Sequence, residues 1–490
     1  MGLMNDVARH YGQSLTAQVD DRREPGPMSL LARIRSLPRR LSEATRPLDL
    51  ATDEAFRRRW DELPPHAKTE AQLIGRQSLG CEGTHGVFPK CDFACKPCYH
   101  SKDANKVRID GPHTVAQVRA QMAFLRERRG PASYAQLIGG EVSLLDADDH
   151  ATALEAMWAE GRIPMSFSHG DFDDDYLHRV VLRADGTARF KAISWALHID
   201  STMKGRRGAE KPATEAELNP FRAAACERFA HLRDAHGVGS YLAHNMTVTP
   251  ANLGQVAEVV RDCVGMGFQM FSFQPAAYVG NEARWEEGFR DVTDDAVWAE
   301  ISAGIGRDLP YRLLQFGDYR CNRITWGAMV GDRYVPALED DDPRDAAARD
   351  QFFATFRGNR MHATPAMLVV RTLRAIVEHP QVIPAGAAWA RRFVRRAGGL
   401  RALRGGIRPV TFVMHSFIDA DDVAPAWDLL QQGERSDEPR IRAAQERLQA
   451  CVYTMGHPET GELVPACVQH SVLDPHENRQ LVELLPMRPR

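Results

Sequence analysis

The chain has 490 residues, of which 43% are hydrophobic and 26% charged, and its formal net charge is −3. This balance excludes an electrostatic case for nucleic-acid binding, so we expect no nucleic-acid partner. Nine cysteines are too few for a disulfide scaffold, and no apolar run reaches the 18 residues of a membrane-spanning helix. The length predicts two or three domains. The N-terminus lacks the pattern of a secretory signal, so we expect a cytoplasmic protein.

Residues 1–70 are predicted to form an N-terminal helical extension. Apolar residues recur at helical spacing between residues 30 and 41, and arginines stand between them. This pattern fits a helix docked on the main domain, and it also fits a surface that meets lipid or a partner. Leu63-Pro64-Pro65 marks the expected boundary.

Residues 71–290 alternate between strand-like and helix-like segments, which predicts an α/β fold with a partial (β/α)6 TIM-like barrel. Strands are expected within 79–88, 134–138, 163–168, 192–200, 241–248 and 270–274. Helices are expected at 114–129, 149–160, 220–236 and 252–266. Asn219 is the expected N-cap of the third helix, and Gly237 is expected to end it. In such a barrel the active site lies at the carboxyl ends of the strands.

Residues 291–490 are predicted to form a C-terminal α+β auxiliary domain that covers the substrate. Asp340-Asp341-Asp342-Pro343 breaks the chain, and a helix is expected at 367–378. The stretch 385–406 interleaves Trp389 and Phe393 with arginines, although paired glycines weaken a helix there. It fits either a solvated face or a peripheral contact with the inner, anionic face of a membrane.

One loop, Lys90 to His100, holds three of the nine cysteines at the spacing C-x3-C-x2-C. Three thiolates this close can converge on one soft metal centre. A zinc site and an ordinary cubane iron–sulfur cluster both need four ligands, and no further cysteine or histidine pair follows at the usual spacing. A cubane held by Cys91, Cys95 and Cys98 would leave one iron open to a non-protein ligand.

This loop, the following Tyr99 and the later Gly139-Gly140-Glu141 together resemble the radical S-adenosylmethionine (radical SAM) superfamily over roughly residues 75 to 280. The resemblance implies a [4Fe-4S] cluster on the three cysteines and SAM as cofactor. It also implies that Gly139, Gly140 and Glu141 contact the amino group of the methionine portion of SAM. The proline that usually follows the glutamate is replaced by Val142.

Further SAM contacts are placed by analogy with related enzymes at the ends of the predicted strands. The candidates are Ser166, His169, Asp200, Ser201, Asn245, Thr247 and Gln274. For each serine, threonine or glutamine, a packed hydrogen-bonding role is the alternative. The aspartates at 171 and 173–175 lack the glycine and distal glutamate of a calcium loop, so we interpret them as a solvated turn.

Six cysteines lie outside the loop. Cys226 and Cys263 fall inside helical patterns and are predicted to be buried small hydrophobes. Four thiolates would complete a second cluster. We therefore expect an auxiliary [4Fe-4S] cluster on Cys321, Cys451 and Cys467, with Cys81 as the fourth ligand or a bystander.

The C-terminal stretch resembles a subgroup, the archaeal tetraether-lipid synthases and related radical SAM methylases. The matching segments are 412–419, 451–453, His457-Pro458-Glu459-Thr460-Gly461 and Val464-Pro465-Ala466-Cys467. Ile418 and Thr454 depart from that pattern, in which a methionine and a histidine stand at these positions.

The resemblance implies reductive cleavage of SAM to a 5′-deoxyadenosyl radical, which abstracts hydrogen from an unactivated carbon. C–C bond formation or methylation of a lipid-like substrate would follow, with a reducing partner such as flavodoxin or ferredoxin. One alternative is a radical SAM maturase that modifies peptides. The non-enzyme alternative is an iron–sulfur electron carrier or a zinc-structured protein.

Overall fold

The computed structural model describes residues 46, 50–99, 103–131, 133–357 and 365–487. The helix expected between residues 30 and 41 lies outside these ranges. The strands are β1 Cys81–Gly83, β2 Ser133–Leu137, β3 Arg162–Ser168, β4 Ala192–His198, β5 Gly239–Val248, β6 Met270–Pro275, β7 Asn322–Val330, β8 Arg333–Pro336, β9 Ile407–His415, β10 Tyr453–His457 and β11 Glu462–Pro465.

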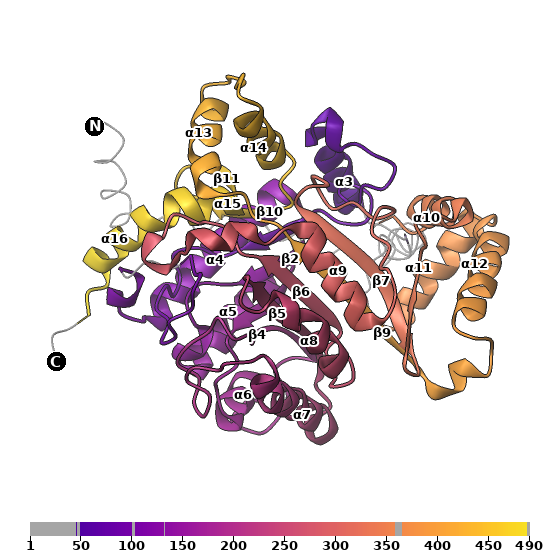
Figure 1. Cartoon of the computed structure of the whole chain (residues 1–490), viewed down its shortest axis with the longest axis horizontal. Coiled ribbons are helices and arrows are strands. Elements are labelled where there is room, and N and C mark those ends of the chain that lie inside the picture. The colour runs from indigo at the N-terminus through magenta and orange to yellow at the C-terminus, as the bar shows by residue number, and fades with distance from the viewer. Residues whose placement is uncertain (1–45, 47–49, 100–102, 132, 358–364, 488–490) are drawn as a thin grey trace, which may run out of the picture.

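These strands form one sheet in the order β11-β10-β1-β2-β3-β4-β5-β6-β9-β7-β8. The eight neighbours from β10 to β9 are all parallel, whereas β11, β7 and β8 add antiparallel edges. The strands β1 to β6 follow one another across the sheet as in a β/α barrel, and the sheet curls around its inner face (Figure 1). The predicted α/β fold with a partial TIM-like barrel is confirmed.

Helices connect the parallel strands and cover the outer face of the sheet (Figure 1). They are α4 Gly111–Arg129, α5 Ala147–Ala159, α6 Asp174–Val181, α7 Asn219–His236, α8 Val256–Cys263 and α9 Asp294–Ile305. Short turns of 3-10 or π helix stand at η1 Pro65–Ala67, η2 Ala104–Lys106, η3 Val142–Leu144, η4 Ala216–Leu218, η5 Leu253–Gln255, η6 Glu282–Arg284, η7 Glu287–Asp291, η8 Ala402–Gly405 and η9 Gln469–Leu473.

Side-chain caps and glycines set the helix ends, and one predicted cap is wrong. Asp110 accepts a hydrogen bond from the backbone N–H of His113 and starts α4, and Gly237 ends α7 with a φ of +69°. The expected N-cap at Asn219 is wrong, because η4 runs directly into α7 and makes Asn219 helical. Helix α6 was not predicted; it begins where Asp173 accepts from the N–H of Tyr176.

The two faces of the sheet differ. Side chains alternate between them along each strand, and parallel Cα partners share a face. Outward-pointing residues such as Trp195, Phe271 and Phe412 join the main hydrophobic core under the helices. Cys226 and Cys263 lie in that same core and are 5% and 0% exposed, which confirms them as buried small hydrophobes. The polar candidate residues of β5 and β6 lie on the inner face.

The residues after 290 contribute β7 to β11 to this sheet, and β9 and β10 extend the parallel run at its two ends. The remaining helices are α3 Leu50–Glu62, α10 Pro343–Thr355, α11 Pro365–Glu378, α12 Val382–Arg396, α13 Ala420–Gln431, α14 Pro439–Gln449, α15 Ala466–Val468 and α16 Asp474–Leu484. The division of the chain at residues 70 and 290 stays a prediction. No helix of the described residues is long and apolar enough to cross a membrane.

Candidate metal and cofactor site

The three clustered cysteines lie on the loop that follows β1, and we call them the loop site. The loop is fixed to the segment after β4, because Ala94 N–H donates to the Lys204 carbonyl at 2.9 Å and Lys96 N–H to Thr202 at 3.1 Å. Burial raises the pKa of the Cys91 thiol to about 12. Burial, together with the neighbouring Cys98 and Cys91 thiolates, raises the pKa of Cys95 well above its usual value. Ligation by a metal would supply the cation that these thiolates need.

Gly139 and Gly140 hold this loop from the neighbouring strand. Gly140 N–H donates to the Phe88 carbonyl at 2.7 Å, and Glu141 N–H donates to the Lys90 carbonyl at 2.8 Å. A Cβ on Gly139 would lie 2.8 Å from the Phe88 ring, and one on Gly140 would lie 2.0 Å from the Lys90 carbonyl oxygen. The two glycines are therefore required for the close approach of two backbones beside the cysteines.

Tyr99 and Glu141 complete this contact. Tyr99 donates its hydroxyl to the Gly139 carbonyl at 3.0 Å. The buried Glu141 carboxylate accepts from Ser143 N–H at 2.9 Å, from the Ser168 hydroxyl at 2.7 Å and from His169 N–H at 2.8 Å. Glu141 thus joins the ends of β2 and β3, and Ser168 is a partner that the sequence did not predict.

His169 also supports the loop site. Its Nε2 atom lies 2.9 Å from an Asp92 oxygen, and its ring stacks on Phe93 with the ring centroids 3.9 Å apart. The structure therefore gives His169 a role in shaping the cysteine loop from behind. Asp92 and Phe93 stand between Cys91 and Cys95, where their side chains can fix the loop's path.

Asp200 and Ser201 stand at the end of β4, and hydrogen bonds fix both side chains. Asp200 accepts from the N–H groups of Thr202 at 2.8 Å and Thr247 at 2.7 Å, and lies 2.7 Å from His198 Nε2. Burial alone would raise the pKa of Asp200, but the charge of His198 and these hydrogen bonds hold it below its usual value. The hydroxyl of Ser201 donates to Glu215 at 2.6 Å.

Polar side chains gather on the inner face near the carboxyl ends of β4 to β6. The Cα register pairs His198 with Asn245, Asn245 with Ser272, and Thr247 with Gln274. Gln274 donates to the Ser272 hydroxyl at 2.7 Å. The structure thus brings together the predicted Asn245, Thr247 and Gln274. His198 and Ser272 were missed, although their place near a strand end on the inward alternation could have indicated them.

Ser166 is a predicted SAM contact that the structure places away from the inner face of the sheet. It points to the outer face, where its hydroxyl lies 2.8 Å from Nε2 of His150 on α5. Its register partner is the outward-facing Trp195. We correct its placement accordingly and leave Ser166 out of the proposed cofactor contacts.

Four more cysteines come from distant parts of the chain, with Cys451 near each of the other three, and we call them the four-cysteine site. Cys81 begins β1, Cys451 precedes β10, Cys321 precedes β7, and Cys467 lies in α15. Burial raises the pKa of Cys81 and Cys467 to about 12 and of Cys321 to about 11, and the charge of the nearby Cys451 adds to each shift. The donor set fits a complete cluster of four thiolates.

Protein groups around the four-cysteine site favour thiolates. Arg447 points its Nε toward the Cys321 sulfur at 3.2 Å, and Ile418 N–H lies 3.5 Å from the Cys467 sulfur. Burial, with the charges of Cys81, Asp474 and Cys451, raises the pKa of Tyr453 well above its usual value. Burial, with the charge of Cys98, likewise raises the pKa of Tyr99.

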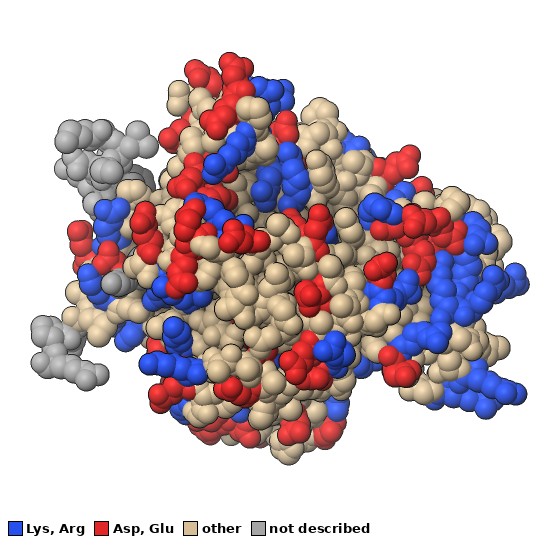
Figure 2. Space-filling view, viewed as in Figure 1, with Lys and Arg blue, Asp and Glu red and all other residues tan. Residues whose placement is uncertain are grey.

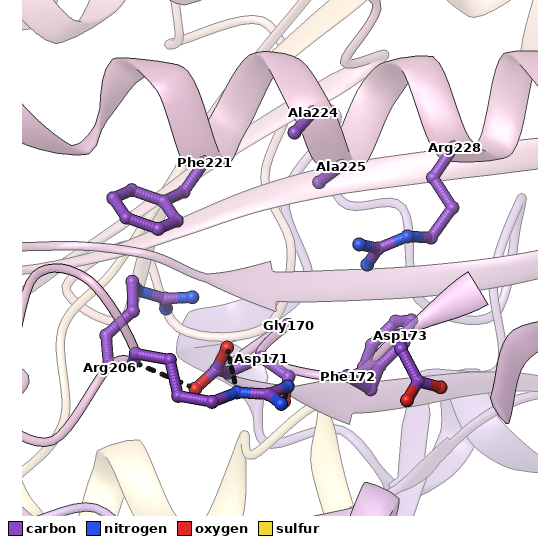
Figure 3. A pocket seen from close by; sticks show the side chains of 10 residues that line it. Gly170, Asp171, Phe172, Asp173, Arg206, Phe221, Ala224, Ala225 and Arg228 are labelled. Atoms are coloured by element: carbon purple, nitrogen blue, oxygen red, sulfur yellow. Dashed lines mark hydrogen bonds and ion pairs between the residues drawn. The ribbon is translucent and has the colours of Figure 1, made fainter. Parts of the chain in front are cut away.

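A cavity of about 190 Å³ opens behind the loop site, between the segments after β3 and β4 and helix α7 (Figure 3). Arginines point into it from both sides. Arg207 is bound to Asp171 at 3.2 Å, and Arg206 donates to the His169 carbonyl at 2.6 Å. The cavity is smaller than the ~300 Å³ at which drug-sized ligand sites begin. The prediction of a solvated turn at residues 171 and 173–175 is wrong in part. Asp171 pairs with Arg207 and Asp173 caps α6, but Asp174 and Asp175 lie in the first turn of α6.

Comparisons with known proteins are limited in extent. No protein-family profile matches the chain, and no curated protein matches it. Among solved structures, Streptococcus suis SuiB matches at 14% identity over 41% of this chain and 40% of that chain, with a TM-score of 0.27. Native anSMEcpe with bound AdoMet matches at 11% identity over 45% of this chain and 57% of that chain, with a TM-score of 0.29. The matches thus span less than three fifths of either of those chains.

Proposed function

We propose that this chain is a radical SAM enzyme that abstracts hydrogen from an unactivated carbon. The observation that carries the proposal is the loop site: three cysteines on one loop after β1, clamped by Gly139 and Gly140 at the edge where the parallel strands end. When bound, a [4Fe-4S] cluster and SAM would supply reductive cleavage of the sulfonium and a 5′-deoxyadenosyl radical. A flavodoxin or ferredoxin would supply the electron.

The chain's own residues would bind and orient these groups. Cys91, Cys95 and Cys98 would hold the cluster, and the backbone at Gly139–Glu141 would present carbonyl groups beside it. The polar residues Asn245, Thr247 and Gln274 face the enclosed inner side of the sheet, where they could orient SAM and the reacting C–H bond. Buried walls would keep water from the radical.

The test is anaerobic incubation of the reconstituted, reduced enzyme with SAM. We expect 5′-deoxyadenosine above background, and its loss to background in Cys95→Ala. Cys226→Ala is the matched control, because that cysteine is buried in the outer core away from the site. No 5′-deoxyadenosine from wild-type enzyme with verified iron content would reject the proposal.

We further propose that the four-cysteine site holds an auxiliary [4Fe-4S] cluster with Cys81 as the fourth ligand. The support is that Cys451 lies near Cys81, Cys321 and Cys467, with the Arg447 guanidinium beside Cys321. Two cubanes would give about eight irons per chain.

A lipid-like substrate and a peripheral contact with an anionic membrane are supported by the paired helices α11 and α12. The apolar side chains of Val369, Leu373 and Val377 on one face of α11 are 57%, 57% and 78% exposed. Arginine side chains gather over the neighbouring α12 (Figure 2). By contrast, Trp389 on α12 faces the protein, since its Nε1 donates to the Ala337 carbonyl at 2.7 Å.

Sedimentation with vesicles tests this contact. Wild-type protein should sediment with vesicles rich in phosphatidylglycerol and far less with pure phosphatidylcholine. Leu373→Asp together with Val377→Asp should reduce binding at least tenfold, because charged groups enter the lipid-facing surface. The exposed Tyr319→Asp on another surface is the control. Equal binding of all variants would remove the membrane contact, without bearing on SAM cleavage.

A further inference from the structure

Two histidine rings stack at the carboxyl ends of neighbouring parallel strands, apart from both cysteine sites. His85 lies two residues beyond β1, and His457 is the last residue of β10. Their ring centroids are 3.8 Å apart with an angle of 21° between the planes. Both side chains are buried, at 7% and 4% exposure. Two cations would repel each other in this arrangement.

Each ring has its Nε2 atom against an oxygen. His85 Nε2 lies 3.1 Å from the Gly456 carbonyl oxygen, which can only accept. His457 Nε2 lies 2.7 Å from the side-chain oxygen of Gln469, whose amide nitrogen donates to Asp474 at 2.9 Å. Both histidines therefore carry a hydrogen on Nε2, and Nδ1 is the nitrogen of each ring that a metal ion could bind in place of a proton.

Both Nδ1 atoms face carboxylates. Glu477 places one oxygen 2.9 Å from Nδ1 of His85 and the other 3.8 Å from Nδ1 of His457. Glu459 lies 3.4 Å from Nδ1 of His457. Candidate ligand atoms of His85, His457 and Glu459 all lie within 4.8 Å of one another. Two ring nitrogens and two carboxylates thus lie close together.

We infer that His85, His457, Glu459 and Glu477 bind a divalent metal ion of the Zn²⁺ class. Imidazole nitrogens and carboxylate oxygens are zinc ligands, and four protein ligands make a closed, structural site. Ligating histidines typically donate their other ring N–H to a carbonyl or carboxylate, as both rings do here. The ligands come from the loop after β1, the β10–β11 hairpin and α16, so the ion would hold three separate segments together.

The site would fix the C-terminal helix against the cysteine loop. His470 of η9, just before α16, packs on Tyr99 with the ring centroids 4.3 Å apart. A small cavity of about 20 Å³, room for one water, lies between His85, Tyr99 and His470. Loss of the ion should therefore loosen α16 and the surroundings of Tyr99, while the ligands of the two cysteine sites stay in place.

Metal analysis of anaerobically purified holoprotein from zinc-supplemented cultures tests the inference. We expect about one zinc per chain in addition to iron. The zinc X-ray absorption edge should show only nitrogen and oxygen neighbours. Glu459→Gln, a mild change at the partly exposed ligand, should lower zinc affinity at least tenfold and speed hydrogen exchange in α16. His236→Ala, in an exposed group of histidines, is the matched control and should keep the zinc.

Three results would overturn the inference. Wild-type protein with less than about one tenth of a zinc per chain would do so, as would sulfur ligands to zinc, which would place the ion at cysteines. Full zinc content in Glu459→Gln combined with Glu477→Gln would also contradict it. None of these outcomes depends on SAM cleavage, because the two cysteine sites share no ligand with this one.

Discussion

The loop site and the four-cysteine site use the same chemistry but are assembled in different ways. Cys91, Cys95 and Cys98 stand on one loop, so their spacing alone brings three thiols together. The four-cysteine site draws on β1, on the residues before β7 and β10, and on α15, so it exists only when the C-terminal strands join the sheet. The first site is local, and the second depends on the tertiary fold. Changes at the two sites should therefore have separable effects.

The largest expected effect comes from Gly140→Ala. The new Cβ would lie 2.0 Å from the Lys90 carbonyl oxygen, so the cysteine loop must move. We expect a loss of about 2 to 3 kcal/mol in the free energy of unfolding and loss of the loop-site cluster, with the auxiliary cluster kept. Urea unfolding and iron analysis measure both.

Gly254→Ala is the control for that substitution. Nothing lies within 4 Å of a Cβ at Gly254, and its backbone is compatible with alanine. This variant should keep wild-type stability within about 0.5 kcal/mol and full iron content. If Gly140→Ala behaved in the same way, the clamp on the loop site would be disproved.

Cys451→Ala should break the four-cysteine site alone. We expect iron to fall from about eight to about four per chain, while SAM is still cleaved to 5′-deoxyadenosine. The matched control Cys263→Ala, in the outer core, should keep all iron. Four irons in the wild type, unchanged in Cys451→Ala, would end the auxiliary-cluster proposal.

Arg447→Gln should tune the auxiliary cluster without removing it. Burial would lower the pKa of Arg447, but the nearby Cys321 and Cys467 thiolates raise it, in keeping with the 3.2 Å between Arg447 Nε and the Cys321 sulfur. Removing that charge favours the oxidised cluster, so its potential should fall by roughly 30 to 60 mV, the one-electron equivalent of about 1 kcal/mol. Redox titration followed by EPR measures it; an unchanged potential would separate Arg447 from the cluster.

Tyr453→Phe should have the smallest effect on the fold. The Tyr453 hydroxyl is buried without a hydrogen-bond partner among the described residues, so its removal should raise the free energy of unfolding of the cluster-free protein by about 1 kcal/mol. Tyr176→Phe is the contrasting control, because the Tyr176 hydroxyl donates to the Val142 carbonyl at 3.0 Å and its loss should destabilise by about 1 kcal/mol. A destabilised Tyr453→Phe would show that the hydroxyl has a partner.

The same contrast between local and tertiary determinants explains what the sequence predicted. Strands β2 to β6 and the pairing of Gly139–Glu141 with the cysteine loop follow from local runs and from the order of β/α units. By contrast, β9 and β10 lie beside β6 and β1 only because the sheet closes around them, and no local pattern encodes a parallel partner.

The misplaced residues have physical reasons too. Ser166 was expected at the site, but both faces of a barrel strand are buried, so polarity could not show that it faces His150 on α5. His85 and His457 were not predicted as a pair, since they are distant in sequence and meet only through the pairing of β1 with β10.

The central claim is that the loop site leaves one iron open for SAM. EPR spectra of reduced Cys451→Ala, in which only the loop-site cluster remains, test it directly before and after SAM is added. We expect the g values of the cluster to shift on SAM addition, because a new ligand enters at the open iron. An unchanged spectrum in a variant with about four irons per chain would contradict the account.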